Sequence, residues 1–387
     1  IAWPVLPKLV QSMGSGAISE ASSTYAVIGV LFALAQFMFS PLIGMLSDKY
    51  GRRPILLISL AGLSIDYLLT ALAPTLFLLG LARIIGGIFG ATISTANAYM
   101  ADISSSDDRA KNFGFIGAAF GVGFILGPAI GGYLGEIDVR LPFFAAAGLG
   151  ALNVLFGYFY LPESLSRENR NVLNLKQASP FSALRRIASF SMLRPLLASL
   201  FITAMAQRGL EAIWVLYTEF RFSWSLADAA NSLVFVGVLY FLVQGFLVGP
   251  IVKKLGEWRT VSIGFMLSGI SMFLFGMADA GWMTYPTIAI YVLGSGLGGP
   301  SLNAICSKTV QPDLQGQLQG TLNSINAVAV IFGPFLAAMV LAHVSSDTPI
   351  VHLPGAWFIL SAVIFSVAVA LTMNSARKLA IASESES

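Results

Sequence analysis

The chain has 387 residues, of which 56% are hydrophobic and only 11% are charged, with a net charge of +3. A soluble domain carries about 25% charged residues, so no soluble fold could bury this much apolar surface, and the lipid bilayer must be the solvent. The single cysteine, Cys306, excludes an intrachain disulfide and a cysteine-built zinc site. No basic tract is interleaved with aromatic residues, which argues against nucleic acid as a partner. We expect no metal and no cofactor.

Eleven apolar segments long enough to cross a bilayer follow one another along the chain, after a shorter apolar stretch at 1–7. An unpaired backbone is too costly in lipid, so these segments must be helices. Because the chain begins at Ile1 without a methionine, we expect 1–7 to be the tail of a first helix that starts upstream. The complete segments are 24–46, 55–73, 75–101, 110–134, 141–161, 194–218, 229–252, 260–278, 283–306, 315–342 and 354–373. The sequence therefore predicts an all-α membrane protein with twelve transmembrane helices.

One long polar stretch divides the predicted helices into two pseudo-symmetric six-helix bundles. An N-terminal bundle, a cytoplasmic linker, a C-terminal bundle and a cytoplasmic tail are expected at 1–161, 162–193, 194–376 and 377–387. The halves repeat at an offset of 206 residues, where Gly127-Pro128 matches Gly333-Pro334. Gly51 corresponds to Gly256, which lies one residue away from the position that this offset predicts. Parallel repeats of this kind build transporters with a substrate site at mid-membrane; the alternative is chance similarity between apolar helices.

The distribution of Lys and Arg predicts the orientation of the chain. Seventeen of the 22 lie in the loops after every second segment, in the polar linker and in the C-terminal tail. Short loops rich in these residues stay in the cytoplasm. Both termini are therefore expected on the cytoplasmic side.

A short charged turn joins the first two complete segments. It reads Gly44-x-x-x-Asp48-x-x-Gly51-Arg52-Arg53-Pro54. The proline suits the first turn of the next helix, where its missing N–H costs nothing. The pattern resembles the signature loop of the major facilitator superfamily, between that family's second and third helices. The resemblance implies a charge cluster that latches the outward-open state, formed by Asp48, Arg52, Arg53 and Asp102.

Segment 110–134 carries closely spaced glycines around a proline. They are Gly123, Gly127, Pro128, Gly131 and Gly132. Glycines four residues apart lie on one helix face and permit close backbone approach, and the proline opens a kink. The spacing alone indicates ordinary close packing. The pattern also resembles the antiporter motif of the drug-exporting branches of the superfamily.

Two ionisable residues lie at matched depth in one predicted helical hairpin. Asp66 precedes the turn at Pro74 by eight residues and Arg83 follows it by nine, which places both at a depth of ~12–14 Å. The sequence Leu79-x-x-x-Arg83-x-x-x-Gly87-x-x-x-Ala91 resembles a family motif whose arginine is tied to proton coupling. Such residues are functional candidates, because a carboxylate held between burial and a nearby arginine can bind and release a proton. The alternative is a permanent ion pair that only holds the helices together.

Arg208 and Glu211 are a second candidate pair, three residues apart on one face of segment 194–218. One interpretation is a pair near the outer interface whose two charges neutralise each other. The alternative is a functional role, as a gate or as an exchangeable proton site. Sequence words such as Ser64-Ile-Asp66-Tyr67 resemble the tetracycline/proton antiporter family, and this resemblance covers nearly the whole chain. Exporters of that family carry a histidine in the eighth helix and an aspartate in the ninth, both linked to proton movement. The aligned positions here are Tyr240 and Leu267, and a tyrosine titrates only near ~10.

Polar and aromatic residues at mid-depth are candidates for a substrate cavity. A single polar residue at this depth more often forms a hydrogen bond between helices than a contact with a ligand. As a set they predict a polar, mostly uncharged cavity. The candidates are Gln36, Asn97, Asn153, Trp214, Tyr240, Gln244, Asn303, Asn323 and Asn326.

These resemblances imply a proton-coupled exporter of small amphipathic compounds, either tetracycline-like drugs or a metabolite, that works by alternating access in a bacterial inner membrane. Its partners are then the substrate, protons and the bilayer, and we expect it to function as a monomer. One alternative is an uptake carrier or uniporter on the same fold, against which the glycine motif argues. Another is a non-transporting receptor or scaffold, against which the charges at matched depth argue. No His-Glu-x-x-His or Gly-x-x-x-x-Gly-Lys motif is present, so we expect no enzyme.

Overall fold

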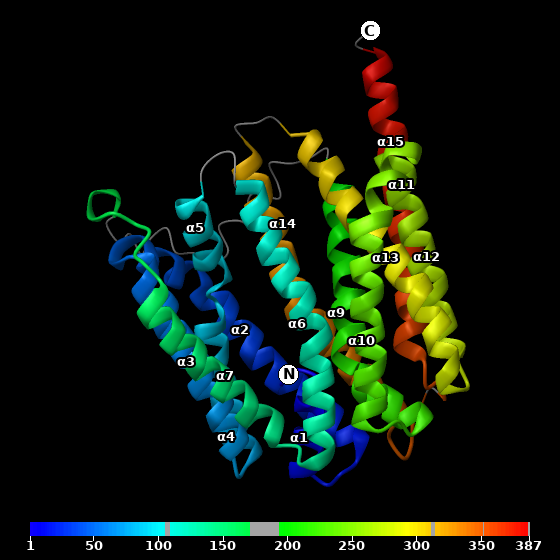
Figure 1. Ribbon diagram of the computed structural model, residues 1–387. Helices are drawn as coiled ribbons and strands as arrows, with labels where there is room; N and C mark the ends of the chain where they lie inside the picture. Colours follow the sequence, from blue (N-terminus) through cyan, green and yellow to red (C-terminus); the bar gives the residue numbers. More distant parts are fainter. Residues whose placement is uncertain (105–108, 171–192, 311–313, 351, 386–387) are drawn as a thin grey trace. The chain divides into compact units, whose positions relative to one another are not determined.

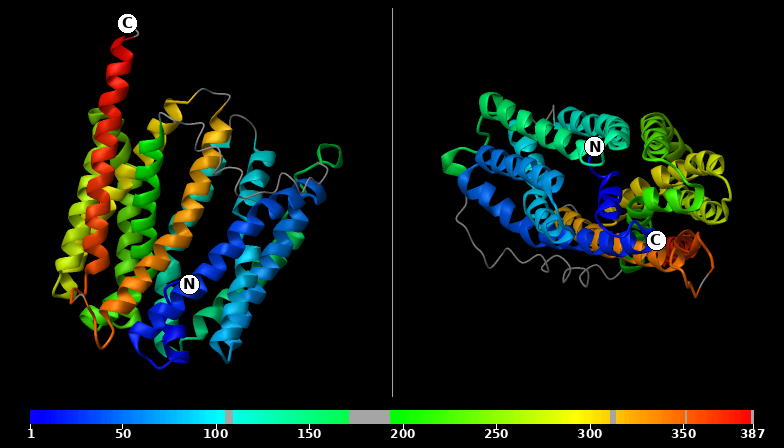
Figure 2. Two further views of the ribbon diagram at one scale, coloured as in Figure 1. Left: turned by 180° about the vertical axis from the view of Figure 1, so that it is seen from behind. Right: turned by 90° about the horizontal axis from the view of Figure 1, so that it is seen from below.

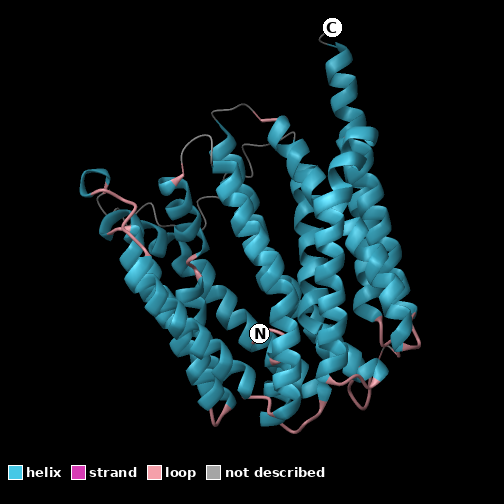
Figure 3. Ribbon diagram, in the orientation of Figure 1, coloured by secondary structure: helices cyan, strands magenta, loops and turns pink. Residues whose placement is uncertain are grey.

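The computed structural model describes residues 1–104, 109–170, 193–310, 314–350 and 352–385. Within these ranges the regular secondary structure is helical, and no strand occurs (Figure 3). Eleven helical spans among the described residues are long and apolar enough to cross a membrane. Each coincides with one of the complete segments expected from the sequence, which confirms an all-α membrane protein.

The chain forms two compact units. Unit 1 comprises Ile1–Pro180 together with Ser225–Asn231. Within it α3 packs against α4 and α7, and α2 packs against α4 (Figure 1). The elements of the first half are α1 (Leu6–Met13), α2 (Ile18–Tyr50), α3 (Arg52–Leu72), α4 (Leu76–Gly90), α5 (Ile93–Ile103), α6 (Arg109–Ile137), α7 (Leu141–Tyr160) and the 3₁₀ turn η1 (Arg167–Asn169).

Unit 2 comprises Phe181–Trp224 together with Ser232–Ser387. Within it α12 packs against α13 and α15, and α9 packs against α14 and α15 (Figure 2). Apolar burial stabilises this packing, since the rings of Tyr217, Phe275 and Phe358 are almost completely buried against one another. The elements of the second half are α9 (Arg194–Phe222), α10 (Leu226–Leu242), the π-helical turn η5 (Val243–Leu247), α11 (Val248–Leu255), α12 (Glu257–Met277), the 3₁₀ turn η6 (Gly281–Met283), α13 (Thr284–Lys308), α14 (Gln315–Val344) and α15 (Ala356–Ser385).

Two element boundaries differ from the prediction for local reasons. The expected helix tail at 1–7 is instead α1, which begins at Leu6 and carries Pro7 in its first turn, where proline is tolerated. The segment at 75–101 breaks after Gly90 and resumes at α5. The Gly90 carbonyl, which the break leaves without a helical partner, accepts a hydrogen bond from Gln36 at 3.0 Å.

The predicted division of the chain falls largely outside the described residues, because 171–192 make up most of the expected linker at 162–193. The bundle boundaries therefore stay a prediction.

The tight turns at Gly51 and Gly256 share one unusual backbone conformation. Gly51, between α2 and α3, has φ 108° and ψ 156°, and Gly256, between α11 and α12, has φ 74° and ψ 162°. Residues with a side chain rarely adopt these angles, whereas glycine adopts them readily. The two glycines are near-partners in the sequence repeat, so the repeat extends to the geometry of these turns.

Candidate functional site

The Asp66 carboxylate and the Arg83 guanidinium form an ion pair inside unit 1, between α3 and α4. The side chain of Asp66 is 1% exposed and that of Arg83 is 8% exposed, so the pair lies almost entirely out of solvent. Thr70, one turn along α3, accepts a hydrogen bond from the same guanidinium at 3.1 Å. The structure thus brings together the two residues that the sequence places at matched depth.

Glycine in α4 makes room for this pair. A Cβ atom at Gly86 would collide with the Asp66 carboxylate, and one at Gly87 would collide with the Phe32 carbonyl of α2. The α3–α4 turn sets the register of the hairpin, because the Thr75 side chain accepts a hydrogen bond from the Leu78 N–H at 3.3 Å and caps α4. A short capped turn and small residues together hold the two charged side chains opposite each other.

Aromatic rings surround the guanidinium of Arg83. Its Cζ atom lies 5.7 Å from the centre of the Phe32 ring and 5.6 Å from that of Tyr67. Among the described residues, its Nε atom has no hydrogen-bond partner. The arginine therefore has one carboxylate, one hydroxyl and two ring faces as its stabilising contacts, and the carboxylate is the only anion among them.

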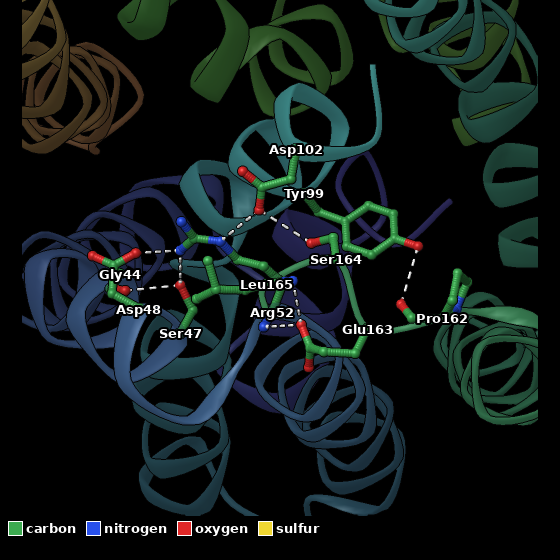
Figure 4. A network of polar contacts seen from close by, with 10 residues as sticks. All are labelled: Gly44, Ser47, Asp48, Arg52, Tyr99, Asp102, Pro162, Glu163, Ser164 and Leu165. Atoms are coloured by element: carbon green, nitrogen blue, oxygen red, sulfur yellow. Dashed lines mark hydrogen bonds and ion pairs between the residues drawn. The ribbon is translucent and has the colours of Figure 1, made fainter. Parts of the chain in front are cut away.

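A second polar network lies where α2 meets α3 (Figure 4). The Arg52 guanidinium forms an ion pair with Asp48, a 3.3 Å ion pair with Asp102 of α5, and a 2.7 Å hydrogen bond to Ser47. Its backbone N–H donates to the Glu163 carboxylate at 2.9 Å. Arg52 thus joins α2, α3, α5 and the segment after α7.

The fourth residue expected in this cluster lies apart from it. Arg53 donates to the Tyr158 carbonyl at 2.6 Å and lies over the Tyr158 ring. Consecutive residues of a helix point in different directions, which separates Arg53 from its neighbour. In its place the network contains Glu163 and Ser164, the latter donating to Asp102 at 3.1 Å. Sequence reasoning missed both residues, because nothing local to them indicates contact with a turn more than a hundred residues earlier.

Unit 2 contains the repeat counterpart of this network. Lys308, at the same offset of 206 residues from Asp102, forms a 2.6 Å ion pair with Glu257. Glu257 follows Gly256 as Arg52 follows Gly51, which places Glu257 one residue off the offset of 206, and both charges are reversed. The offset of 206 aligns Asp102 with Lys308 but Arg52 with Trp258, so the repeat alone does not indicate this pair.

Arg208 and Glu211 form the expected pair on α9, with 2.8 Å between Nη1 and Oε2. Gln207 donates to the other carboxylate oxygen at 3.1 Å. The Arg208 side chain is 44% exposed, so this pair reaches the surface of unit 2. Tyr240 of α10 lies in hydrogen-bond contact with Ser295 of α13, at 2.6 Å between the hydroxyl oxygens. The sequence did not single out Ser295.

The remaining cavity candidates fall into two groups. Trp214 is 4% exposed, donates to Ser232 at 2.8 Å and packs edge-on against Phe275, so it belongs to the interior of unit 2. Gln36 and Asn326 bond to helix carbonyls, Gly90 and Leu322 respectively. The exposed candidates are Asn97, Asn153, Gln244, Asn303 and Asn323. Contact of any of them with substrate stays a prediction.

The glycines of α6 permit the close approach that their spacing predicts. A Cβ atom at Gly127 would lie 3.0 Å from the Ile1 nitrogen, and one at Gly131 would collide with the Ile1 carbonyl. A Cβ atom at Gly132 would collide with Ala230, in the part of α10 that belongs to unit 1. Pro128 lies inside the continuous α6, and Gly123 has open space around it.

Eleven apolar spans among the described residues, with one ion pair buried between two of them, are typical of a multi-pass membrane transporter. The family model of the Major Facilitator Superfamily matches residues 1–334, and the chain belongs to this superfamily. The class C tetracycline resistance protein of Escherichia coli is 39% identical over 89% of this chain and 86% of its own length. The class G protein of Vibrio anguillarum is 38% identical over 86% and 84%.

More distant relatives agree with this assignment. Multidrug resistance protein 2 of Bacillus subtilis is 28% identical over 87% of this chain and 83% of its own length. The crystal structure of the human organic anion transporter MFSD10 superposes with a TM-score of 0.70 at 25% identity, covering 95% of this chain and 94% of that one. The chain is therefore a transporter of this superfamily and not an enzyme.

Proposed function

We propose that this protein exports small amphipathic compounds, tetracycline-like drugs or a metabolite, from a bacterial cell in exchange for protons bound at Asp66. It lies in the inner membrane with both termini in the cytoplasm. The observation that carries the proposal is the buried Asp66–Arg83 pair, in which one carboxylate neutralises one guanidinium away from solvent. Coupling requires a group whose charge changes inside the membrane, and Asp66 supplies it.

Protonation of Asp66 changes the energy of this arrangement through Arg83. Removing one charge of a buried pair leaves the other uncompensated, at a cost of about 3–5 kcal/mol. Thr70 and the rings of Phe32 and Tyr67 remain in contact with the guanidinium but carry no negative charge. The protonated carrier is therefore driven toward another arrangement of these helices, and a proton shifts the equilibrium between its states.

The Arg52 network acts as the conformational latch in this scheme. It connects the ends of three helices to the segment after α7. Movement of these helix ends would break the contacts, so the network favours the state in which they are formed. The Lys and Arg distribution supports a cytoplasmic position for this end of unit 1. The predicted bundles at 1–161 and 194–376 are the two halves that move, and one chain supplies both, so we expect a monomer to suffice.

Flux measurements in proteoliposomes test the proposal. Purified protein is reconstituted with an imposed pH gradient, and internal pH is followed while compounds of a panel that includes tetracycline are added. An exporter of the proposed kind moves protons down their gradient only when a transported compound is present, and a protonophore abolishes uphill movement of that compound. Substrate flux that does not depend on the pH gradient would instead identify a uniporter.

A further inference from the structure

Three hydroxyl groups gather in unit 2 beside the Arg208–Glu211 pair, and we name Tyr240, Tyr291 and Ser295 the hydroxyl cluster. Tyr291 and Ser295 are four residues apart on α13, so they share one face of that helix. Ser295 contacts Tyr240 of α10 at 2.6 Å between the oxygens. Tyr291 lies within range of electrostatic interaction with Tyr240, Glu211 and Arg208.

The Tyr291 hydroxyl is buried without a partner. Tyr291 is 6% exposed, and among the described residues its hydroxyl oxygen has no hydrogen bond. Its ring packs against Phe275 with 6.5 Å between centroids. A phenylalanine would make the same ring contact, whereas an unpaired buried hydroxyl costs free energy. The hydroxyl is therefore explained by a partner that it meets in another step of the transport cycle.

The other groups of this region leave hydrogen-bond donors unused. Glu211 is satisfied on both oxygens, by Arg208 and Gln207. In the Tyr240–Ser295 contact one hydroxyl donates to the other, which leaves one of their two O–H groups available. With Tyr291 and the partly exposed Arg208 guanidinium, the region presents several donors, of which the guanidinium can only donate. Such a set suits an acceptor oxygen on the ligand.

We propose that the hydroxyl cluster is a specificity-determining subsite, which donates hydrogen bonds to a ketone, enol or carboxylate oxygen of the exported compound. This inference rests on the proposed export function. It assigns a role to Tyr291 and Ser295, which the sequence patterns do not indicate, and to Tyr240, which cannot serve as a proton carrier near neutral pH. Compounds without acceptor oxygens do not use the subsite.

Binding measurements with two kinds of probe test the assignment. Tetracycline and norfloxacin carry several acceptor oxygens, and tetraphenylphosphonium carries none. The variants are Tyr291→Phe and the double variant Tyr240→Phe/Ser295→Ala. The controls are Tyr217→Phe and Ser268→Ala, which remove hydroxyls of the same unit that bond to backbone carbonyls. Unfolding is followed with a thiol-reactive dye, because Cys306 is the single cysteine and is buried.

We expect each cluster variant to weaken binding of the oxygen-rich probes about 2- to 10-fold, the effect of one net neutral hydrogen bond. Binding of tetraphenylphosphonium should stay unchanged, and the controls should affect neither kind of probe. Equal losses for both kinds of probe, or no loss for the oxygen-rich probes, would overturn the subsite. Wild-type protein that binds none of the probes and moves no protons with them would overturn the export of drugs of this kind, a result that selectivity changes cannot mimic.

Discussion

Replacing Asp66 by asparagine tests the coupling mechanism most directly. Asparagine keeps the size of the side chain and one acceptor oxygen for Arg83, but it neither carries a charge nor takes up a proton. The substitution therefore separates the electrostatic role of the pair from its packing role. We expect Asp66→Asn to abolish uphill export while the protein remains folded in the membrane.

The cost to stability follows from the contacts that remain. Leaving a buried charge without its partner costs about 3–5 kcal/mol. In the variant the Arg83 guanidinium still contacts an amide oxygen, the Thr70 hydroxyl and two ring faces. The ring contacts are the same in wild type and variant and so do not offset the loss, whereas the amide oxygen still accepts from Arg83, so we expect a net loss of about 3 kcal/mol, at the lower end of that range. The thiol-dye assay at Cys306 measures it. Asp279→Asn is the matched control, because Asp279 also pairs with an arginine but is 84% exposed, and exposed pairs contribute about 0–1 kcal/mol.

Transport is measured in two modes in the same proteoliposomes. Uphill export driven by a pH gradient requires proton turnover, whereas exchange of labelled for unlabelled substrate across the membrane does not. In the variant Asp66→Asn the rate of uphill export should fall by more than about tenfold, which corresponds to about 1.4 kcal/mol of activation free energy, whereas exchange should be retained. Normal uphill export by the variant would show that Asp66 is structural, and Glu211 would then be the remaining candidate.

Three further outcomes are expected. Asp48→Asn should slow turnover at saturating substrate while leaving binding intact, because the latch lies apart from the buried pair; weakened binding with normal turnover would contradict this. Lys308→Gln should lower thermal stability by about 0.5–1 kcal/mol, with turnover nearly unchanged, and Glu257→Gln should match it; a large loss of turnover would instead make this pair a second latch. Expression in a drug-sensitive host should give weak tetracycline resistance, because tyrosine and leucine replace two ionisable residues; strong resistance that collapses with a protonophore would refute that expectation.

Local features of the fold and site could be predicted from the sequence because they depend on short spacings. The hairpin turn at Pro74 and the rise of a helix place Asp66 and Arg83 opposite each other, and the structure pairs them. Gly51 marks a turn that needs a positive φ. Membrane-spanning length marks the helices themselves, so their number and order follow from hydropathy alone.

Contacts between distant segments could not be predicted in this way. Glu163 reaches Arg52 from after α7, and only the packing of α7 against α3 brings them together. The same limit applies to Trp214, whose polar N–H suggests a ligand contact from sequence but donates to Ser232 inside unit 2. Matched depth indicates which residues share a layer of the membrane, whereas the direction in which each side chain points depends on packing.

The two repeat-related ion pairs differ in how they meet the helix dipoles. Glu257 lies in the first turn of α12 and Lys308 in the last turn of α13, and each charge is favourable at that end of a helix. In unit 1 the signs are reversed, since Arg52 begins α3 and Asp102 lies near the end of α5, so both charges oppose the dipoles. The Arg52 network therefore depends on added contacts from Asp48, Ser47 and Glu163. A pair that depends on several partners is weakened when any one of them moves, as the proposed latch requires, whereas the helix dipoles already favour the pair in unit 2, which agrees with the small effect expected on turnover.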